Sequence, residues 1–217
     1  MINAVVAGAA GLFLAALLVC ELTQLRWWAL GTKTAASVLF VVAALLQPRP
    51  QEAYFAWVLG GLSLGLVGDV CLALPGKRSF LAGLVAFLLG HIAYVVAFAV
   101  LVTKGSWSSP VHALLVIVSA GVLYWLWPKL GSMRGPVIAY VIVITSMVAV
   151  AWTAFRDPFQ TTLGGGTLLV GAIAFYLSDL FVARERFLVK GFANKLIGLP
   201  LYYAGQFLIA FSVGLVS

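Results

Sequence analysis

The sequence is dominated by eight apolar stretches, each about as long as the ~20 residues that a membrane-spanning helix needs. Charged residues, prolines and clustered polar residues separate them, and they cover residues 2–20, 27–46, 54–74, 79–102, 109–127, 136–155, 162–182 and 196–216. Backbone groups inside a bilayer have no water to bond, so each stretch is predicted to be a helix, whose hydrogen bonds close within the segment. We therefore expect an all-α, polytopic membrane protein, a bundle of about eight transmembrane helices.

The composition excludes a water-soluble globule. Of the 217 residues, 64% are hydrophobic and 9% are charged, whereas soluble domains carry roughly 25% charged residues. The first stretch lacks the basic n-region of a secretory signal peptide and is expected to be the first helix. Because the spans and their short loops use nearly the whole chain, we expect a single integral membrane domain over residues 1–217.

The basic residues predict how the bundle is oriented. The net charge of +7 does not indicate nucleic-acid binding, because the basic residues are scattered in ones and twos at the ends of apolar stretches. Loops one, three, five and seven carry nine of them, namely Arg26, Lys77, Arg78, Lys129, Arg134, Arg184, Arg186, Lys190 and Lys195. Loops two, four and six carry three, namely Arg49, Lys104 and Arg156. The positive-inside rule then predicts cytoplasmic odd loops and periplasmic termini, in a multi-pass protein of the bacterial inner membrane.

A weak internal repeat is also suggested. The third stretch ends with Gly68-Asp69 and the seventh with Ser178-Asp179, and the two aspartates are 110 residues apart, close to half the chain. A duplication of four helices, residues 1–108 and 109–217, would produce this spacing. Parallel repeats of this kind occur in transporters.

Ionisable side chains inside the apolar stretches mark a candidate site. Each costs at least about 2.5–3.5 kcal/mol at the centre of a bilayer and is by default a functional hypothesis. Asp69 and Asp179 precede the cytoplasmic charges of their loops by eight and five residues, which is roughly 12 and 7 Å along a helix. With this orientation, all four such residues lie in the cytoplasmic half or near the midplane: Lys33, Asp69, His91 and Asp179.

Polar faces on neighbouring helices extend this set. His91 and Tyr94 share one face of the fourth helix, and Tyr203 and Gln206 share one face of the eighth. Structural readings remain open for these groups. In these readings the aspartates pair with Lys33 or cap a backbone break near Gly68, and His91 is a hydrogen-bonded core residue. Hydrogen bonds between helices are the structural role for Tyr140, Tyr202, Tyr203 and Gln206.

Three kinds of chemistry fit these groups. Ser178 beside Asp179 leaves an acyl-enzyme mechanism open, and Asp69, His91 and Asp179 together would supply three metal ligands. The third possibility, acid-base chemistry by a pair of carboxyl groups, needs fewer residues than a metal site. Apolar surroundings favour the protonated form of one carboxyl group, and a cation such as Lys33 favours the charged form of the other. Such a pair provides an acid and a base.

The ordered set of motifs resembles the YhhN-like membrane proteins, a family that includes the lysoplasmalogenases. The resemblance covers about residues 20 to 212. It rests on Gly68-Asp69, on Phe80-x2-Gly83-x3-Phe87-x3-His91-x2-Tyr94, on Tyr140 with Met147, on Gly171-Ala172-x2-Phe175-x2-Ser178-Asp179, and on Tyr202-Tyr203-x2-Gln206. Relatives tend to have a proline after the lysine of the second helix, whereas Lys33 is followed by Thr34.

The resemblance implies hydrolysis of the vinyl ether bond of a lysoplasmalogen, with no required metal or other cofactor. Its partners would be a lysophospholipid-type substrate and the bilayer, and an apolar groove should accommodate the lipid tail. The catalytic candidates are Asp69, Asp179 and His91, and the substrate-binding candidates are Lys33, Tyr94, Tyr140, Ser178, Asn194, Tyr203 and Gln206. The alternative is a transporter or lipid-binding protein that uses the same residues to relay protons or bind cargo.

Overall fold

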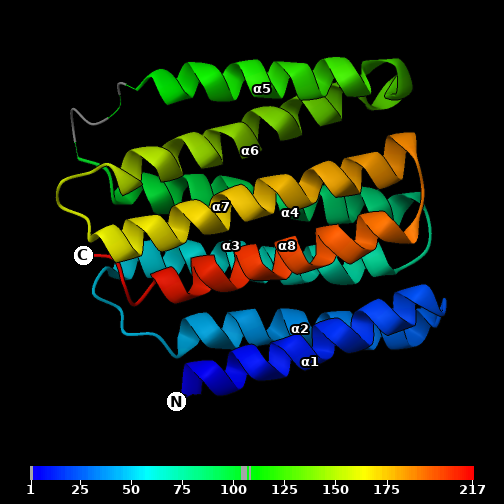
Figure 1. The fold of residues 1–217 in the computed structure, drawn as a ribbon, viewed down its shortest axis with the longest axis horizontal. Coiled ribbons are helices and arrows are strands. Elements are labelled where there is room, and N and C mark those ends of the chain that lie inside the picture. Colours follow the sequence, from blue (N-terminus) through cyan, green and yellow to red (C-terminus); the bar gives the residue numbers. More distant parts are fainter. Residues whose placement is uncertain (1, 104–106, 108) are drawn as a thin grey trace.

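A computed structural model describes residues 2–103, 107 and 109–217. Lys104, which contributes to the predicted orientation, lies outside these residues. The described chain forms eight long helices (Figure 1): α1 (Ile2–Leu22), α2 (Arg26–Leu45), α3 (Glu52–Ala73), α4 (Lys77–Val100), α5 (Pro110–Leu126), α6 (Arg134–Phe155), α7 (Thr162–Ala183) and α8 (Phe192–Ser212). Short 3-10 turns η1 (Trp127–Lys129) and η2 (Gly131–Met133) precede α6, and a π-helical turn η3 (Arg184–Leu188) follows α7.

The predicted all-α membrane bundle is confirmed. Helices α1 to α7 are long and apolar enough to cross a bilayer, so the chain is an integral, multi-pass membrane protein. Helix α8 is less apolar because it carries buried polar residues such as Asn194 and Gln206. The predicted start of this helix at residue 196 is wrong: α8 begins at Phe192. The polar first turn is stable as helix because Asn194 finds hydrogen-bond partners within the protein.

Helices α3, α4, α7 and α8 form the centre of the bundle. Figure 1 shows α1 and α2 on one side of them and α5 and α6 on the other. Helix α2 packs against α3 and α8, and α6 packs against α7 and α4. This is the pairing that two copies of a four-helix unit would give, although the repeat itself stays a prediction.

Small residues bring the central helices close together. A Cβ atom added to Gly205 of α8 would lie 2.9 Å from the carbonyl oxygen of Gly171 in α7. In a bilayer, helices gain no hydrophobic free energy by leaving lipid for one another, so this close backbone approach contributes much of their attraction. It also fixes the height of α8 against α7, and both helices carry residues of the site.

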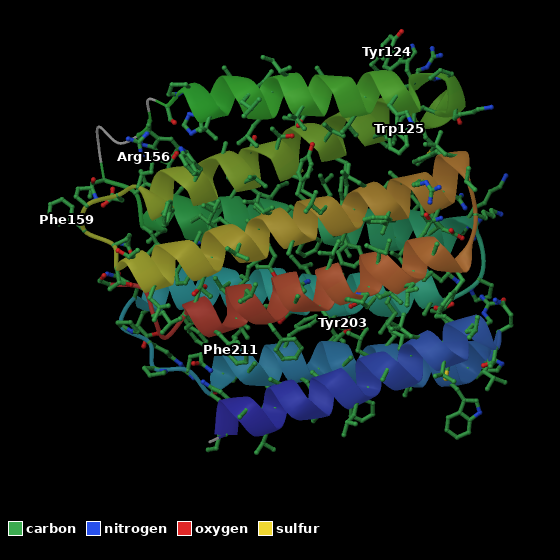
Figure 2. All side chains as sticks on the ribbon, in the orientation of Figure 1. Tyr124, Trp125, Arg156, Phe159, Tyr203 and Phe211 are labelled. Carbon is green, nitrogen blue, oxygen red and sulfur yellow. The ribbon has the colours of Figure 1, made fainter. Side chains whose placement is uncertain are left out.

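The outer helices present apolar side chains to the surroundings. Figure 2 shows Tyr203 and Phe211 in the interior and Tyr124 pointing away from α5; the Tyr124 side chain is 84% exposed. The two termini lie at the same end of the bundle (Figure 1). The loops that follow α1, α3, α5 and α7 therefore lie at the opposite end, here called the loop end.

Candidate active site

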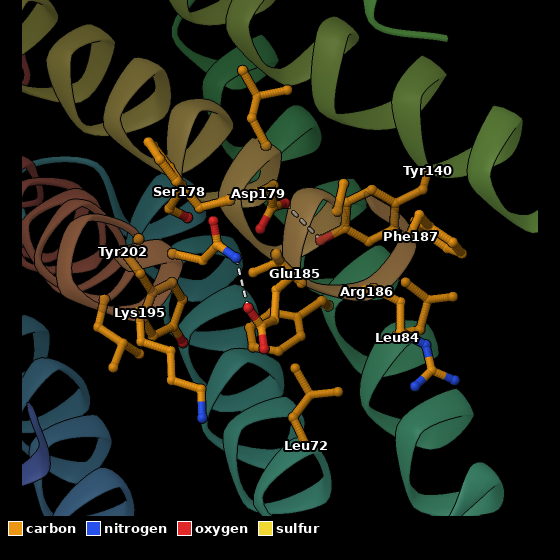
Figure 3. Close-up of a pocket in the computed structure, with 18 of the residues that line it drawn as sticks. Leu72, Leu84, Tyr140, Ser178, Asp179, Glu185, Arg186, Phe187, Lys195 and Tyr202 are labelled. Atoms are coloured by element: carbon orange, nitrogen blue, oxygen red, sulfur yellow. Dashed lines mark hydrogen bonds between the residues drawn. The ribbon is translucent and has the colours of Figure 1, made fainter. Parts of the chain in front are cut away.

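A cavity of about 430 Å³ opens near the loop end of the bundle. Every one of the eight long helices contributes to its walls, for example Lys33 from α2 and Asp69 from α3. Figure 3 shows Asp179 of α7 among the residues that line it. Glu21 at the end of α1 and Phe80 at the start of α4 also line it, which places its mouth at the loop end. Both predicted catalytic aspartates therefore face the same space.

Asp69 is held by three neighbours. Its Oδ1 atom lies 3.0 Å from Lys33 Nζ, and its Oδ2 atom accepts hydrogen bonds from Ser37 Oγ at 2.5 Å and Tyr202 OH at 2.7 Å. The Asp69 side chain is 1% exposed and that of Lys33 is 14% exposed. Because both oxygens are engaged, this carboxylate forms a fixed, ion-paired part of the cavity wall.

A series of buried hydrogen bonds leads to Asp69 through Tyr202. Tyr94 OH donates to Gln206 Oε1 at 2.6 Å, and Gln206 Nε2 donates to Tyr202 OH at 3.1 Å. Tyr203 OH donates to the Lys33 carbonyl oxygen at 3.1 Å. Tyr94, Tyr203 and Gln206 are not among the residues that line the cavity. Their contacts orient Tyr202 and the second helix, and direct contact with a substrate stays a prediction for them.

Asp179 has different surroundings. Its Oδ2 atom accepts a hydrogen bond from Tyr140 OH at 2.8 Å, which Figure 3 marks with a dashed line, and lies 3.7 Å from His91 Nε2. Its side chain is 17% exposed toward the cavity. Among the described residues, Asp179 makes no ion pair with a lysine or arginine. The site thus contains one carboxyl group paired with a fixed cation and one without such a pair.

His91 lies against Asp179 and does not line the cavity itself. Its Nδ1 atom is 2.6 Å from the Phe87 carbonyl oxygen; a carbonyl only accepts, so Nδ1 carries the proton and the Nε2 of a neutral ring has a free lone pair. Within the described chain, Nε2 is the one buried side-chain nitrogen or oxygen without a hydrogen-bond partner. The rings of Phe175 and Tyr140 pack edge-on against the imidazole. The lone pair therefore points toward the Asp179 carboxyl group at a distance too long for a hydrogen bond.

The acyl-enzyme and metal-site alternatives gain no support from these contacts. Ser178 lines the cavity, but its hydroxyl donates to the Phe175 carbonyl oxygen at 2.9 Å and so is not activated as a nucleophile. Over the described ranges, no three His, Cys, Asp or Glu side chains are grouped closely enough to hold a metal ion. Asp69, His91 and Asp179 are thus not arranged as a set of metal ligands.

The mouth of the cavity is formed largely by the turn between α7 and α8. Glu185, Arg186 and Lys190 line it, and so do Asn194 and Lys195 from α8. Asn194 Nδ2 donates to Glu185 Oε2 and to the Val189 carbonyl oxygen, both at 2.6 Å, and holds the turn in place. Of these residues, only Asn194 is predicted from the sequence as a site residue. The sequence pattern of the other residues indicates orientation in the membrane and does not distinguish them from ordinary loop charges.

Much of the remaining wall is apolar. Val122 and Leu126 of α5, Val141 and Ile144 of α6, and Leu180 of α7 line it. A cavity with charged residues at its mouth and an aliphatic wall is suited to an amphipathic ligand.

Comparison with known proteins gives a consistent set of relatives. The model of the YhhN family matches residues 28–213. A protein named lysoplasmalogenase from Mycobacterium bovis is 31% identical over 178 residues, which is 79% of this chain and 64% of the relative. Human lysoplasmalogenase TMEM86B is 32% identical over 194 residues, covering 87% of this chain and 76% of the relative. An uncharacterized membrane protein YhhN from Escherichia coli is 30% identical over 156 residues, covering 72% of this chain and 73% of the relative.

The lengths of these relatives differ from that of the chain. The match spans a little under two thirds of the mycobacterial relative and about three quarters of the human one. No solved structure matches the chain.

Proposed function

The chain belongs to the YhhN family, and from this premise we propose that it is a membrane hydrolase that cleaves the vinyl ether bond of lysoplasmalogens. The products would be a fatty aldehyde and a glycerophospho-choline or glycerophospho-ethanolamine. Relatives named lysoplasmalogenase support the substrate class. The observation that carries the proposal is the cavity with two differently paired aspartates, Asp69 beside Lys33 and Asp179 beside Tyr140 and His91.

The chemistry of a vinyl ether needs a positioned acid. Its double bond takes up a proton on the carbon distal to the oxygen, which leaves an oxocarbenium ion. Water adds to the carbon next to the oxygen and loses a proton, and the hemiacetal that results collapses to aldehyde and alcohol. The overall reaction consumes one water. An acid for the carbon, a negative charge for the cation and a base for the water are the groups that lower this barrier.

Asp179 is the proposed proton donor. It faces the cavity and has no lysine or arginine partner among the described residues, and a carboxyl group in such surroundings is better suited to hold a proton than one beside a lysine. After donating the proton it becomes a carboxylate beside the cation, and it recovers a proton from the attacking water. Tyr140 orients it through the hydrogen bond to Oδ2, and His91 Nε2 lies 3.7 Å from the same atom.

Asp69 is the proposed fixed charge. Lys33 and two hydroxyl donors occupy its oxygens, so it is well placed to keep one geometry. Its negative charge on the cavity wall would stabilise the oxocarbenium ion. Lys33, Tyr140, Ser178 and Asn194 line the same cavity as proposed substrate contacts.

Product analysis tests the activity. We expect the purified protein to release fatty aldehyde from lysoplasmalogen and no fatty acid from an ordinary lysophospholipid, because the site contains an acid for the vinyl ether and no activated nucleophile for an ester. Mass spectrometry of both incubations distinguishes the two products. Binding of lysoplasmalogen without aldehyde release would instead favour the transporter or lipid-binding function.

The orientation in the membrane is a second expectation. We propose that the protein lies in a bacterial inner membrane with the loop end and the cavity mouth in the cytoplasm and both termini in the periplasm, as the distribution of basic residues indicates. Reporter fusions in the loops after α3 and α7 should then be active only as cytoplasmic reporters. A periplasmic signal from either loop would invert the orientation.

A further inference from the structure

Two cations at the cavity mouth have no carboxylate partner within the described chain. Four basic residues line the cavity, and two of them form ion pairs, Lys33 with Asp69 at 3.0 Å and Lys195 with Glu21 at 2.6 Å. The other two, Arg186 and Lys190, form no ion pair there. Two positive charges without an ion-pair partner among the described residues therefore lie at the mouth.

The nearby Glu185 does not cancel this charge by pairing with either cation. Its Oε2 atom accepts hydrogen bonds from Gly191 N at 2.8 Å and from Asn194 Nδ2 at 2.6 Å. These bonds tie the turn after α7 to the start of α8. Glu185 thus stabilises this turn, and Arg186 and Lys190 remain available to a ligand.

Arg186 packs against an aromatic ring. Its guanidinium carbon lies 4.0 Å from the centre of the Phe80 ring, at the start of α4. Stacking on an aromatic face restricts the side chain and leaves the N–H groups at the guanidinium edge free to donate. A planar fork of this kind is well suited to the oxygens of a phosphate group.

The spacing matches a glycerophospholipid. Arg186 follows Asp179 by seven residues, of which the last three belong to the π-helical turn η3. It therefore lies nearer the mouth by at most about 10 Å, the rise of seven residues in an α-helix, and both residues line the cavity. In a lysoplasmalogen, seven covalent bonds separate the distal vinyl carbon from phosphorus, roughly 8 Å at ordinary bond lengths. A substrate whose vinyl ether meets Asp179 would bring its phosphate to Arg186.

We propose that Arg186 and Lys190 form a phosphate-binding subsite for the head group of the lysophospholipid. The identity of this lipid rests on the function proposed above, whereas recognition of a phosphate monoanion rests on the two cations themselves. The subsite sets the depth of the lipid in the cavity, so that the bond to be cleaved stops beside Asp179.

Binding to a lipid that cannot be cleaved tests the subsite separately from the activity. The probes are a saturated 1-O-alkyl lysophosphocholine, the 1-O-alkylglycerol with the same chain, and inorganic phosphate, with affinity measured on the full chain in detergent. Because charge-assisted hydrogen bonds are strong, the wild-type protein should bind the phosphocholine at least about tenfold more tightly than the alkylglycerol. Arg186→Gln combined with Lys190→Gln should remove this preference and leave alkylglycerol binding unchanged. Inorganic phosphate that binds as tightly as the lipid would overturn the head-group assignment.

A matched pair of variants controls for general charge at this membrane face. Arg134 stacks on Trp127 at 4.7 Å much as Arg186 stacks on Phe80. Arg134 and Lys77 also lie at the loop end, and neither lines the cavity. Arg134→Gln with Lys77→Gln should leave the phosphocholine preference intact, and an equal loss in this control would overturn the subsite.

Further measurements keep the outcome decisive. If the double variant does not fold, Lys190→Gln and Arg186→Lys are measured singly, and unchanged preference in both overturns the proposal. A wild-type protein that prefers the phosphocholine but releases no aldehyde from lysoplasmalogen would contradict the proposed hydrolysis and support the subsite. A protein that releases aldehyde but does not prefer the phosphocholine would support the proposed hydrolysis and contradict the subsite.

Discussion

Replacing Asp179 with asparagine is expected to lower aldehyde release by at least about 100-fold, which is the contribution of a positioned acid. Asparagine has nearly the same size and still accepts the hydrogen bond from Tyr140 OH, which lies 2.8 Å from Oδ2 in the wild-type protein. It has no acidic proton to give to the vinyl carbon. The measurement is initial rate of aldehyde release, together with the thermal stability of the same purified sample.

Two neighbouring substitutions serve as controls for this result. Tyr140→Phe and His91→Gln each remove one contact of Asp179 but keep its carboxyl group, so their rates should fall less than that of Asp179→Asn. Unchanged thermal stability in Asp179→Asn would assign its loss of rate to chemistry. Full activity in this variant would contradict the role of Asp179 as the acid.

Replacing Asp69 with asparagine is expected to damage the fold as well as the activity. The substitution leaves the Lys33 ammonium, 3.0 Å away and 14% exposed, without its counter-charge in a membrane-spanning segment. Removing one partner of a buried ion pair costs about 3–5 kcal/mol, and the partial exposure of Lys33 favours the lower end of this range. The measurement is the temperature at which the detergent-purified protein loses its monodisperse peak in size-exclusion chromatography.

A second substitution separates the two effects of Asp69. Lys33→Met combined with Asp69→Asn removes both charges, and this variant should be more stable than Asp69→Asn alone because no unpaired charge remains. Its aldehyde release should stay low if the carboxylate stabilises the cation. Equal stability of the single variant and the wild-type protein would show that the ion pair contributes little to the fold.

Much of the candidate site was accessible from the sequence because ionisable residues in apolar stretches are rare and costly. That ground predicts Asp69, Asp179 and Lys33, the family resemblance predicts Tyr140, and the structure brings all four to one cavity. The two cations proposed to bind phosphate are not predicted in this way. In the sequence, Arg186 and Lys190 are ordinary loop charges. In the structure Arg186 lies in the π-helical turn after α7, Lys190 follows this turn, and both line the cavity.

The sequence by itself determined that this chain crosses a membrane, how many helices it forms and where most of them end. Those properties depend on local hydropathy and on the length of each apolar stretch, and both can be obtained from the sequence alone. It did not determine which face of each helix is inside, because residues facing lipid and residues facing neighbouring helices are equally apolar. Only the tertiary structure decided that Lys33 pairs with Asp69 and that His91 and Tyr140 meet Asp179. Close contacts between small residues and a few buried hydrogen bonds set the rotation and height of each helix, and these contacts join residues far apart in the chain.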